Sequence, residues 1–262
     1  MPMTDVAIED PVIAHVKDGV GWLAFNNPAR HNALTEPMCT AIVETLAAFD
    51  ADPAVRLCVI RGAGEKAFVS GADIGGLKAD GTARREQAPT MLAFNALRDF
   101  RKPLVAMIRG WCLGGGVAVA MKADLRICDA TAKFGVPAAR LGVGYPLDSV
   151  RDLVNLVGPS KAKTILFTAE RLSAHQAAEI GLADEVLAPD ALEGRIAEIA
   201  SAIVDNAPLS IRAAKAAIDH VARGAWSEAE VGAFVSECYQ SADFKEGRAA
   251  FMEKRRPAFK GA

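Results

Sequence analysis

The chain has 262 residues with 51% hydrophobic side chains and a mean hydropathy of +0.16, enough for one large domain, or a domain with a helical extension, around a sizeable core. Its formal net charge of -2 excludes the general electrostatic attraction that marks partners such as nucleic acid or an acidic membrane surface. The sequence has no apolar run near the roughly 18 residues that span a bilayer, no leader pattern in Met1–Asp5 and no CxxC pair among its five cysteines, so we expect a soluble cytoplasmic protein with buried free thiols.

The N-terminal part begins with a hairpin pattern. Val12–Val16 and Val20–Phe25 flank Asp18-Gly19, a pair that suits the type I′ turn between two antiparallel strands. A helix is expected to follow from Thr35, because threonine is a favoured N-cap residue. The apolar residues on one face of that helix are Ile42, Leu46 and Phe49.

Strand and helix patterns alternate through the middle of the chain. The expected strands are Leu57–Ile60, Leu104–Ile108, Asp124–Cys128 and Lys133–Gly135, and the expected helices are Met91–Phe100 and Gly115–Ala123. Because such alternation needs right-handed crossovers, it implies a largely parallel sheet. The residues expected on one face of the helix at 91–100 are Leu92, Asn95, Ala96 and Asp99. The polar stretch Lys78–Pro89 predicts a loop or a short helix, either a lid beside the site or a tolerated insertion.

Helical patterns dominate from Asp148 onward. Ser173 with Gln176, and Ser227 with Glu230, are capping boxes that open two of these helices. Helices are expected at Ser160–Phe167, Ala191–Val204, Leu209–Ala222, Ser227–Gln240 and Asp243–Lys254, with a short strand at Asp184–Leu187.

Two glycine-containing turns follow strand-like runs. One contains Gly71, and the other contains the three adjacent glycines Gly114–Gly116 ahead of a buried helix. Such turns leave backbone N–H groups bare and let a ligand approach closely, although they could also merely let a helix and a strand pack tightly. Two amides that converge from separate turns make an oxyanion hole, which stabilises a developing enolate or tetrahedral oxyanion. A dinucleotide site is the main rival, but the GxGxxG spacing is absent.

Five segments carry a resemblance to a known family. They are Asn26–Leu34, Phe68–Ile74, Gly110–Met121, Phe134–Pro137 and Ala250–Arg255. In these segments the sequence resembles the crotonase (enoyl-CoA hydratase/isomerase) superfamily, and the resemblance extends from about Val12 to about Lys260. One motif alone would be weak, whereas five in the family's order are specific.

The resemblance implies the fold and the partners. The fold class would be α/β, with a crotonase-like spiral of ββα turns in residues 1–200 and a C-terminal helical oligomerisation region in residues 201–262. The chain would form a homo-oligomer, a trimer or a dimer of trimers, although the helix faces could equally cover their own sheet. The substrate would be an acyl-CoA thioester, with coenzyme A as part of the substrate and no permanently bound cofactor.

The resemblance also assigns roles to individual residues. The backbone amides of Ala72 and Gly115 would hold the thioester oxygen. Arg30 and Lys254 would meet the phosphates of the nucleotide, with Lys254 reaching a neighbouring subunit's ligand. The alternative for Arg30 and His31 is an ordinary solvated loop. The full set of expected coenzyme A contacts is Arg30, Ala33, Ser70, Ala72, Asp73, Ile74, Phe251 and Lys254.

The chain departs from the family at the catalytic acids. Crotonase-type hydratases carry one glutamate two positions past the three glycines and another directly after the proline of the FGxPE segment. Here these positions are Ala118 and Ala138, and neither alanine can move a proton. Ordinary hydration by two carboxylates is therefore not expected, and the site should suit a bulky, branched or cyclic acyl group better than a short straight one.

Four residues are candidates for the missing acid or base. Asp148 is either an acid facing an apolar pocket or the N-cap of a helix that starts at Ser149. Tyr145 is either a weak acid near the enolate or a partly buried ring with a bonded hydroxyl. Arg140 either holds a carboxylate of the acyl group or forms a structural salt bridge, and Glu86 is a further candidate on the possible lid.

Two classes of function remain open at this point. One is an acyl-CoA enzyme with a non-standard acid or base, such as an isomerase, hydrolase or decarboxylase. The other is a crotonase-fold protein that binds acyl-CoA with little turnover. The four histidines are dispersed without ligand spacing, so no metal site is expected.

Overall fold

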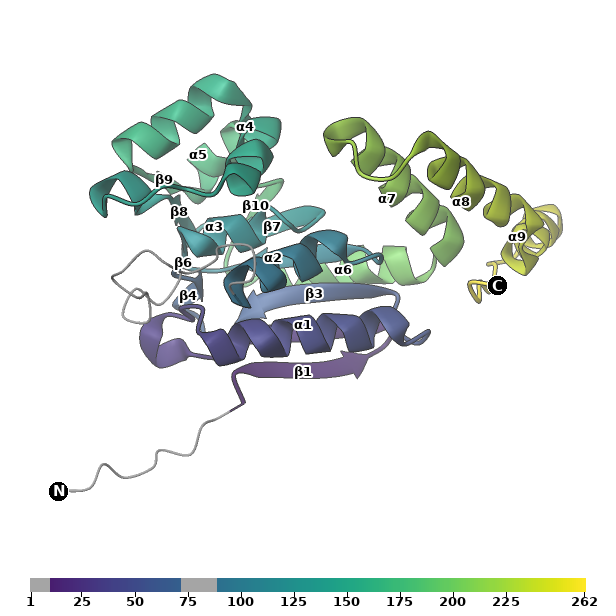
Figure 1. Cartoon of the computed structure of the whole chain (residues 1–262). Helices are drawn as coiled ribbons and strands as arrows, with labels where there is room; N and C mark the ends of the chain where they lie inside the picture. Colours follow the sequence, from purple (N-terminus) through teal and green to yellow (C-terminus); the bar gives the residue numbers. More distant parts are fainter. Residues whose placement is uncertain (1–9, 72–88) are drawn as a thin grey trace.

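A mostly parallel six-stranded sheet forms the centre of the protein (Figure 1). The computed structural model describes residues 10–71 and 89–262. The strand order is β1-β2-β3-β5-β7-β10, in which β1 and β2 are antiparallel and all other neighbours are parallel. The strands are β1 (Val12–Lys17), β2 (Val20–Phe25), β3 (Leu57–Gly62), β5 (Leu104–Ile108), β7 (Leu125–Asp129) and β10 (Glu185–Leu187). The expected hairpin is confirmed, since Asp18 and Gly19 both have the positive φ of a type I′ turn, 51° and 81°.

A second, four-stranded sheet lies beside the first. It has the order β4-β6-β8-β9 and consists of β4 (Ala67–Val69), β6 (Trp111–Leu113), β8 (Lys133–Gly135) and β9 (Arg171–Ser173). The chain passes from the large sheet to the small one three times, from β3 to β4, from β5 to β6 and from β7 to β8, and returns through a helix. This path is the expected spiral of ββα turns, so the fold class is confirmed. The strands β4, β6 and β9 were not expected, whereas β8 was, because a run of only three residues gives a weak pattern.

Helices cover both faces of the large sheet. On one face lie α1 (Glu36–Ala51), α2 (Pro89–Asp99) and α3 (Gly115–Ala120), whose apolar side chains join the larger core cluster. On the other face lies α6 (Leu192–Val204), which packs Leu192, Ile196 and Ala200 against the strands. The expected cap of α1 is confirmed, since the Thr35 side chain accepts a hydrogen bond from the Met38 N–H.

The expected helix at 91–100 is confirmed as α2, and the structure decides which of its faces is buried. The structure buries Ala93, Phe94 and Leu97, whereas Leu92 is 49% exposed. The two faces differ by one position along the helix, so both have helical spacing. Only the direction from which α1 and α3 pack against α2 decides which of its two faces lies in the core.

The segment α4 (Leu147–Thr168) consists of two helical stretches separated by a break. Gly158, with φ 75° and ψ 163°, is not helical, and the stretch that follows it from Pro159 contains the helix expected at 160–167. The short helix α5 (Ala174–Glu179) follows, and both predicted capping boxes, at Ser173 and at Ser227, are present.

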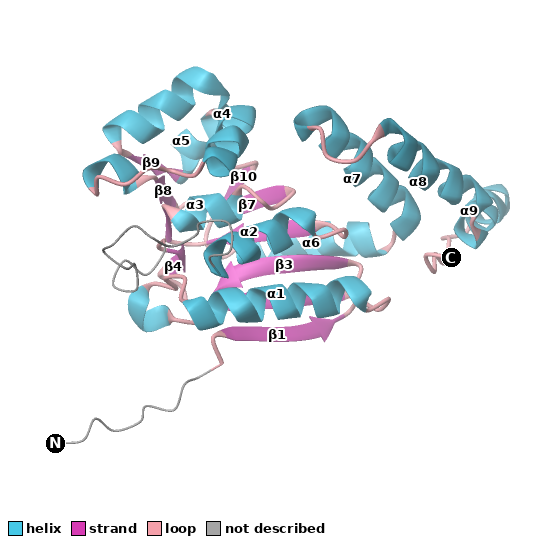
Figure 2. Cartoon of the chain, in the orientation of Figure 1, coloured by secondary structure: helices cyan, strands magenta, loops and turns pink. Residues whose placement is uncertain are grey.

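Three helices form an arm that extends away from the sheet on one side (Figures 1 and 2). The arm consists of α7 (Pro208–Arg223), α8 (Glu228–Gln240) and α9 (Ala242–Glu253). Polar contacts tie it to the core: the Lys215 ammonium group pairs with Asp124 at 2.8 Å, and the Arg223 guanidinium donates to the Arg98 carbonyl at 3.3 Å. The large apolar side chains that the arm leaves most exposed are Ile218, Val221, Tyr239, Phe251 and Met252. Among the described residues, no helix is long and apolar enough to cross a membrane.

Candidate active site

The two glycine turns meet at the ends of β4 and β6. A Cβ atom on Gly71, whose φ is 120°, would lie 3.4 Å from the Leu113 carbonyl oxygen and 3.8 Å from the Gly115 nitrogen. A Cβ atom on Gly116 would lie 1.9 Å from the Val69 carbonyl oxygen, closer than atoms can approach. Only glycine therefore allows the backbones of the two turns to lie this close.

The Gly115 amide is placed to act as a hydrogen-bond donor. It stands at the start of α3, where N–H groups have no partner within the helix. In the part of the chain that the structure describes, no oxygen accepts a hydrogen bond from this group. The preceding Gly114 has φ 52° and ψ -110°, and its N–H donates to the Gly135 carbonyl at 2.8 Å. The turn thus brings the Gly115 nitrogen close to Gly71.

The loop expected to bind coenzyme A is joined directly to the Gly71 turn. Leu34 N–H donates to the Gly71 carbonyl at 2.8 Å, and Ser70 N–H donates to the His31 carbonyl at 3.1 Å. The Ser70 hydroxyl also donates to the carbonyl of the exposed Arg30, at 3.2 Å. Half-buried Ala33 lies in the same loop. The structure therefore brings together Arg30, Ala33, Ser70 and Gly115 around one junction.

Asn32 organises this junction, and sequence reasoning did not single it out. Its side chain is fully buried; Oδ1 accepts from the Asn27 N–H at 3.0 Å, and Nδ2 donates to the carbonyls of Ala63 at 3.0 Å and Ala67 at 2.8 Å. Its φ of 57° lies in the left-handed region, which asparagine tolerates better than most residues. An asparagine next to a tight loop was the signal available in the sequence.

We expect Asn32→Ala to destabilise the protein by about 2–3 kcal/mol, because three backbone groups, one fully buried and two partly buried, lose their partner. The measurement is the free energy of unfolding in urea. Asn206→Ala is the matched control, since Asn206 is exposed just after α6 and its side chain donates to the Ala202 carbonyl of that helix, at 2.8 Å. A variant at position 32 as stable as this control would contradict the assigned role.

The two alanines at the positions of the hydratase glutamates, Ala118 and Ala138, are packed against the core. Ala118 in α3 is 1% exposed, and Ala138, in the short 3-10 helix Pro137–Arg140, is partly buried against the same cluster. Both contribute only a methyl group to their surroundings, so no carboxylate stands at either position.

Asp148 does not have the surroundings expected of it. The helix begins at Leu147 with Pro146 as its N-cap, so the expected cap at Asp148 is wrong. The carboxylate instead accepts from the Arg151 guanidinium at 2.9 Å and is about half exposed. It lines a cavity of about 610 Å³ between the core and the arm, whose charged walls replace the expected apolar pocket. Neither glycine turn lines that cavity.

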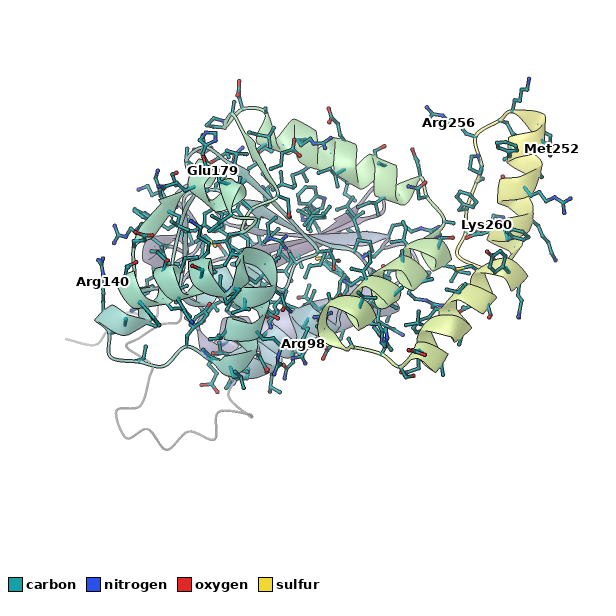
Figure 3. All side chains as sticks on the ribbon, turned by 90° about the horizontal axis from the view of Figure 1, so that it is seen from above. Arg98, Arg140, Glu179, Met252, Arg256 and Lys260 are labelled. Atoms are coloured by element: carbon teal, nitrogen blue, oxygen red, sulfur yellow. The ribbon has the colours of Figure 1, made fainter. Side chains whose placement is uncertain are left out.

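The two other described candidates for an acid lie in different surroundings. The Tyr145 hydroxyl donates to the Gly114 carbonyl at 3.1 Å, and its ring packs against the core, as the alternative of a partly buried, bonded tyrosine predicted. Burial, followed by the nearby Cys112 and Asp152, raises the pKa of Tyr145 well above its ordinary value, so its proton is hard to release. Arg140 is exposed, and its side chain points away from the body of the protein (Figure 3).

The remaining expected residues are not part of this junction. Ala72, Asp73, Ile74 and Glu86 lie outside the described residues. Phe251 lies in α9 and Lys254 directly after it, and Figure 1 shows α9 at the far end of the arm, on the opposite side of the molecule from β4 and the start of α1. Within the described residues, no group of three histidine, cysteine, aspartate or glutamate side chains could hold a metal ion.

Comparison with known proteins identifies the family. The profile of the family described as "Enoyl-CoA hydratase/isomerase" matches residues 15–262. The chain belongs to this enoyl-CoA hydratase/isomerase family. It is 35% identical to the crotonyl-CoA hydratase of Syntrophomonas wolfei, over 95% of this chain and 97% of that protein. It is 32% identical to the (E)-benzylidenesuccinyl-CoA hydratase of Thauera aromatica, over 96% of this chain and 100% of that protein.

Solved structures of the same family share the fold. An enoyl-CoA hydratase/carnithine racemase from Magnetospirillum magneticum superposes with a TM-score of 0.88 at 32% identity, covering 97% of each chain. The resemblance read from five short segments is therefore confirmed along nearly the whole chain. By its homologues, the chain is an enzyme of the enoyl-CoA hydratase/isomerase family.

Proposed function

We propose that this family member binds an acyl-CoA thioester and stabilises its enolate between two backbone amides. The observation that supports the proposal is the close approach of the two glycine turns, in which the Gly115 nitrogen lies 3.8 Å from where a Cβ atom on Gly71 would be. The second donor would be the amide of Ala72, the residue after Gly71. Two such donors aimed at a developing oxyanion are the largest single contribution that a protein makes to this kind of chemistry.

The acyl group is bulky, and the reaction is not efficient hydration of a short enoyl chain. Alanines at 118 and 138 remove two side chains and two negative charges from the two catalytic positions. The relative from Thauera aromatica supports a bulky acyl group, because its name specifies a thioester with an aromatic ring. Of the acid candidates, Asp148 is paired with Arg151 and Tyr145 with Gly114, so an isomerase, hydrolase or decarboxylase built on this oxyanion hole would need another group, or water, to move its protons.

The test is a panel of CoA thioesters, straight, branched and aromatic, incubated with the protein and read by mass spectrometry. Gain of water, release of coenzyme A and loss of carbon dioxide each give a distinct mass change, and a double-bond shift is detected by chromatography. Turnover of a bulky thioester supports the proposal. Turnover confined to short straight enoyl-CoA esters would contradict it.

A second candidate is an acyl-CoA-binding protein with little turnover. The uncharged positions 118 and 138 favour it, because binding by the oxyanion hole needs no carboxylate. Calorimetry separates the two candidates. Tight binding of a thioester that stays chemically unchanged would select the binding protein.

We infer that a second copy of the chain completes the coenzyme A site. Phe251 and Lys254 are expected to contact the coenzyme, yet they lie on the arm, far from the loop that carries Arg30 (Figure 1). In a trimer or a dimer of trimers, the arm of one chain would reach the loop of the next. Residues 201–262 would then be the oligomerisation region and residues 1–200 the spiral core. The five free thiols, four of them buried, support a place in the reducing cytoplasm.

Arg30→Ala and Lys254→Ala should each weaken binding of coenzyme A thioesters by roughly 3- to 10-fold, because each removes a charge-assisted contact to phosphate. The loss should be larger at low ionic strength, where such contacts are screened less. Dissociation constants from calorimetry at two salt concentrations test this, with light scattering for the oligomeric state. Unchanged constants in both variants would refute the site. A monomer that still depends on Lys254 would refute the role of the second copy.

A further inference from the structure

The Tyr145 hydroxyl makes a contact that the proposed chemistry does not yet use. It donates to the carbonyl oxygen of Gly114, a residue 31 positions earlier in the chain. The same oxygen also accepts the Ala118 N–H of α3, at 3.2 Å. Tyr145 itself stands between the 3-10 helix Pro137–Arg140 and α4, so it brings a third part of the chain to the second glycine turn.

The geometry of the peptide bond turns this contact into control over the Gly115 amide. A trans peptide is planar, so the carbonyl of Gly114 and the N–H of Gly115 point in opposite directions. Donors that hold the carbonyl on one side therefore aim the N–H to the other side. The Gly115 nitrogen lies 3.8 Å from where a Cβ atom on Gly71 would be, which places this donor at the junction of the two turns.

The turn needs such a restraint because its own residues supply little. Gly114 has the positive φ and negative ψ that only glycine adopts with ease, and Gly115 and Gly116 follow it. Peptides between glycines rotate with the least steric resistance, since there is no Cβ to oppose the motion. The hydrogen bonds from Tyr145 and Ala118 to Gly114 oxygen, and from Gly114 N–H to Gly135, oppose this rotation.

We propose that Tyr145 is a positioning residue: its hydroxyl fixes the peptide between Gly114 and Gly115 so that the Gly115 N–H is directed at the thioester oxygen. This proposal rests on the proposed oxyanion hole and extends it to the residue that orients one donor. It replaces the reading of Tyr145 as an acid, because the hydroxyl proton is already donated to a backbone carbonyl. The high pKa of the buried phenol keeps that proton in place across the working pH range.

Tyr145→Phe tests the proposal, because it keeps the ring in the core and removes only the hydroxyl. The other tyrosine of the chain supplies the matched control: Tyr239 in α8 is 66% exposed and stacks edge-on against Phe244, a contact that phenylalanine keeps. The ligand is crotonyl-CoA with ¹³C at the thioester carbonyl. The measurements are its dissociation constant, the infrared stretch of the bound carbonyl, and kcat and KM for its slow hydration.

In Tyr145→Phe, kcat should fall roughly 10- to 100-fold, since a misaligned oxyanion donor costs somewhat less than a deleted one. KM and the dissociation constant should change by less than about threefold, because coenzyme A is held elsewhere and the ground-state carbonyl gains little from this donor. The carbonyl stretch should move toward its frequency in water, as the hydrogen bond to the bound thioester weakens. Tyr239→Phe should match the parent in every measurement.

Other outcomes would contradict either the positioning role of Tyr145 or the proposed function. A carbonyl stretch and kcat equal to the parent's would overturn the role of Tyr145 while leaving the oxyanion hole intact. Loss of one limb of the pH–rate profile with an unmoved carbonyl stretch would show that Tyr145 is an acid after all. If the parent binds no acyl-CoA, the proposed function fails. A crystal structure of Tyr145→Phe then decides the positioning role alone, since an unrotated peptide between Gly114 and Gly115 would overturn it.

Discussion

Crotonyl-CoA is expected to be hydrated by this chain far more slowly than by a family hydratase that carries both glutamates, by about 10²–10⁴-fold for each absent acid or base. Hydration needs one group to take a proton from water and one to deliver a proton to the α-carbon. The chain has Ala118 and Ala138 at the two positions, and the buried methyl group of Ala118 leaves no polar atom there. The oxyanion hole alone would then carry whatever rate remains.

The comparison is best made side by side with the crotonyl-CoA hydratase of Syntrophomonas wolfei, at equal protein concentration and pH. Binding of crotonyl-CoA, measured by calorimetry on the same sample, is the control that separates a missing acid from a damaged site. Hydration of crotonyl-CoA at the rate of an efficient hydratase would contradict this expectation. It would mean that another pair of residues moves the two protons.

Gly116→Ala is expected to destabilise the protein strongly, by about 4 kcal/mol or to the point of failure to fold. The added Cβ would lie 1.9 Å from the Val69 carbonyl oxygen and 2.8 Å from the Val69 carbonyl carbon. Both are backbone atoms of β4, which pairs with β6 just before the glycine turn, so neither side can yield without separating the two turns. Overpacking against backbone has no rotamer that relieves it.

The matched control is Gly232→Ala in α8, which makes the same chemical change in open space. No atom lies within 4 Å of a Cβ on Gly232, and we expect a gain of about 0.5–1 kcal/mol, because alanine is the better helix former. Urea unfolding monitored by circular dichroism measures both variants. If Gly116→Ala were as stable as Gly232→Ala, the close approach of the two glycine turns would be wrong, and with it the basis of the oxyanion hole.

Several features of the fold and the two glycine turns of the candidate site could be predicted from local sequence. Asp18-Gly19 has the backbone preference of a type I′ turn, and Thr35 caps its helix with its own hydroxyl, so both features depend only on neighbouring residues. The Gly71 and Gly114–Gly116 turns were found in the same way, because glycine marks the positions where backbone must approach backbone. The family resemblance then joined these local signals into one expected site.

Other features could not be predicted because they depend on pairs of residues distant in sequence. The side chain of Asn32 is buried because the carbonyls of Ala63 and Ala67 meet it, and nothing near Asn32 specifies that meeting. Asp148 could serve as a cap or an acid on local grounds, and the arm across the cavity decides its surroundings.

By itself, the sequence determined the strand–helix alternation, the positions of the glycine turns and the absence of glutamate at 118 and 138, since each follows from the chemistry of single residues or of close neighbours. Only the tertiary structure decided that three-residue strands form a second sheet, that α2 buries Phe94 rather than Leu92, and that the Tyr145 hydroxyl meets the Gly114 carbonyl. These contacts arise when segments far apart in the chain pack together, and the free energy that selects them belongs to the whole core rather than to any one segment.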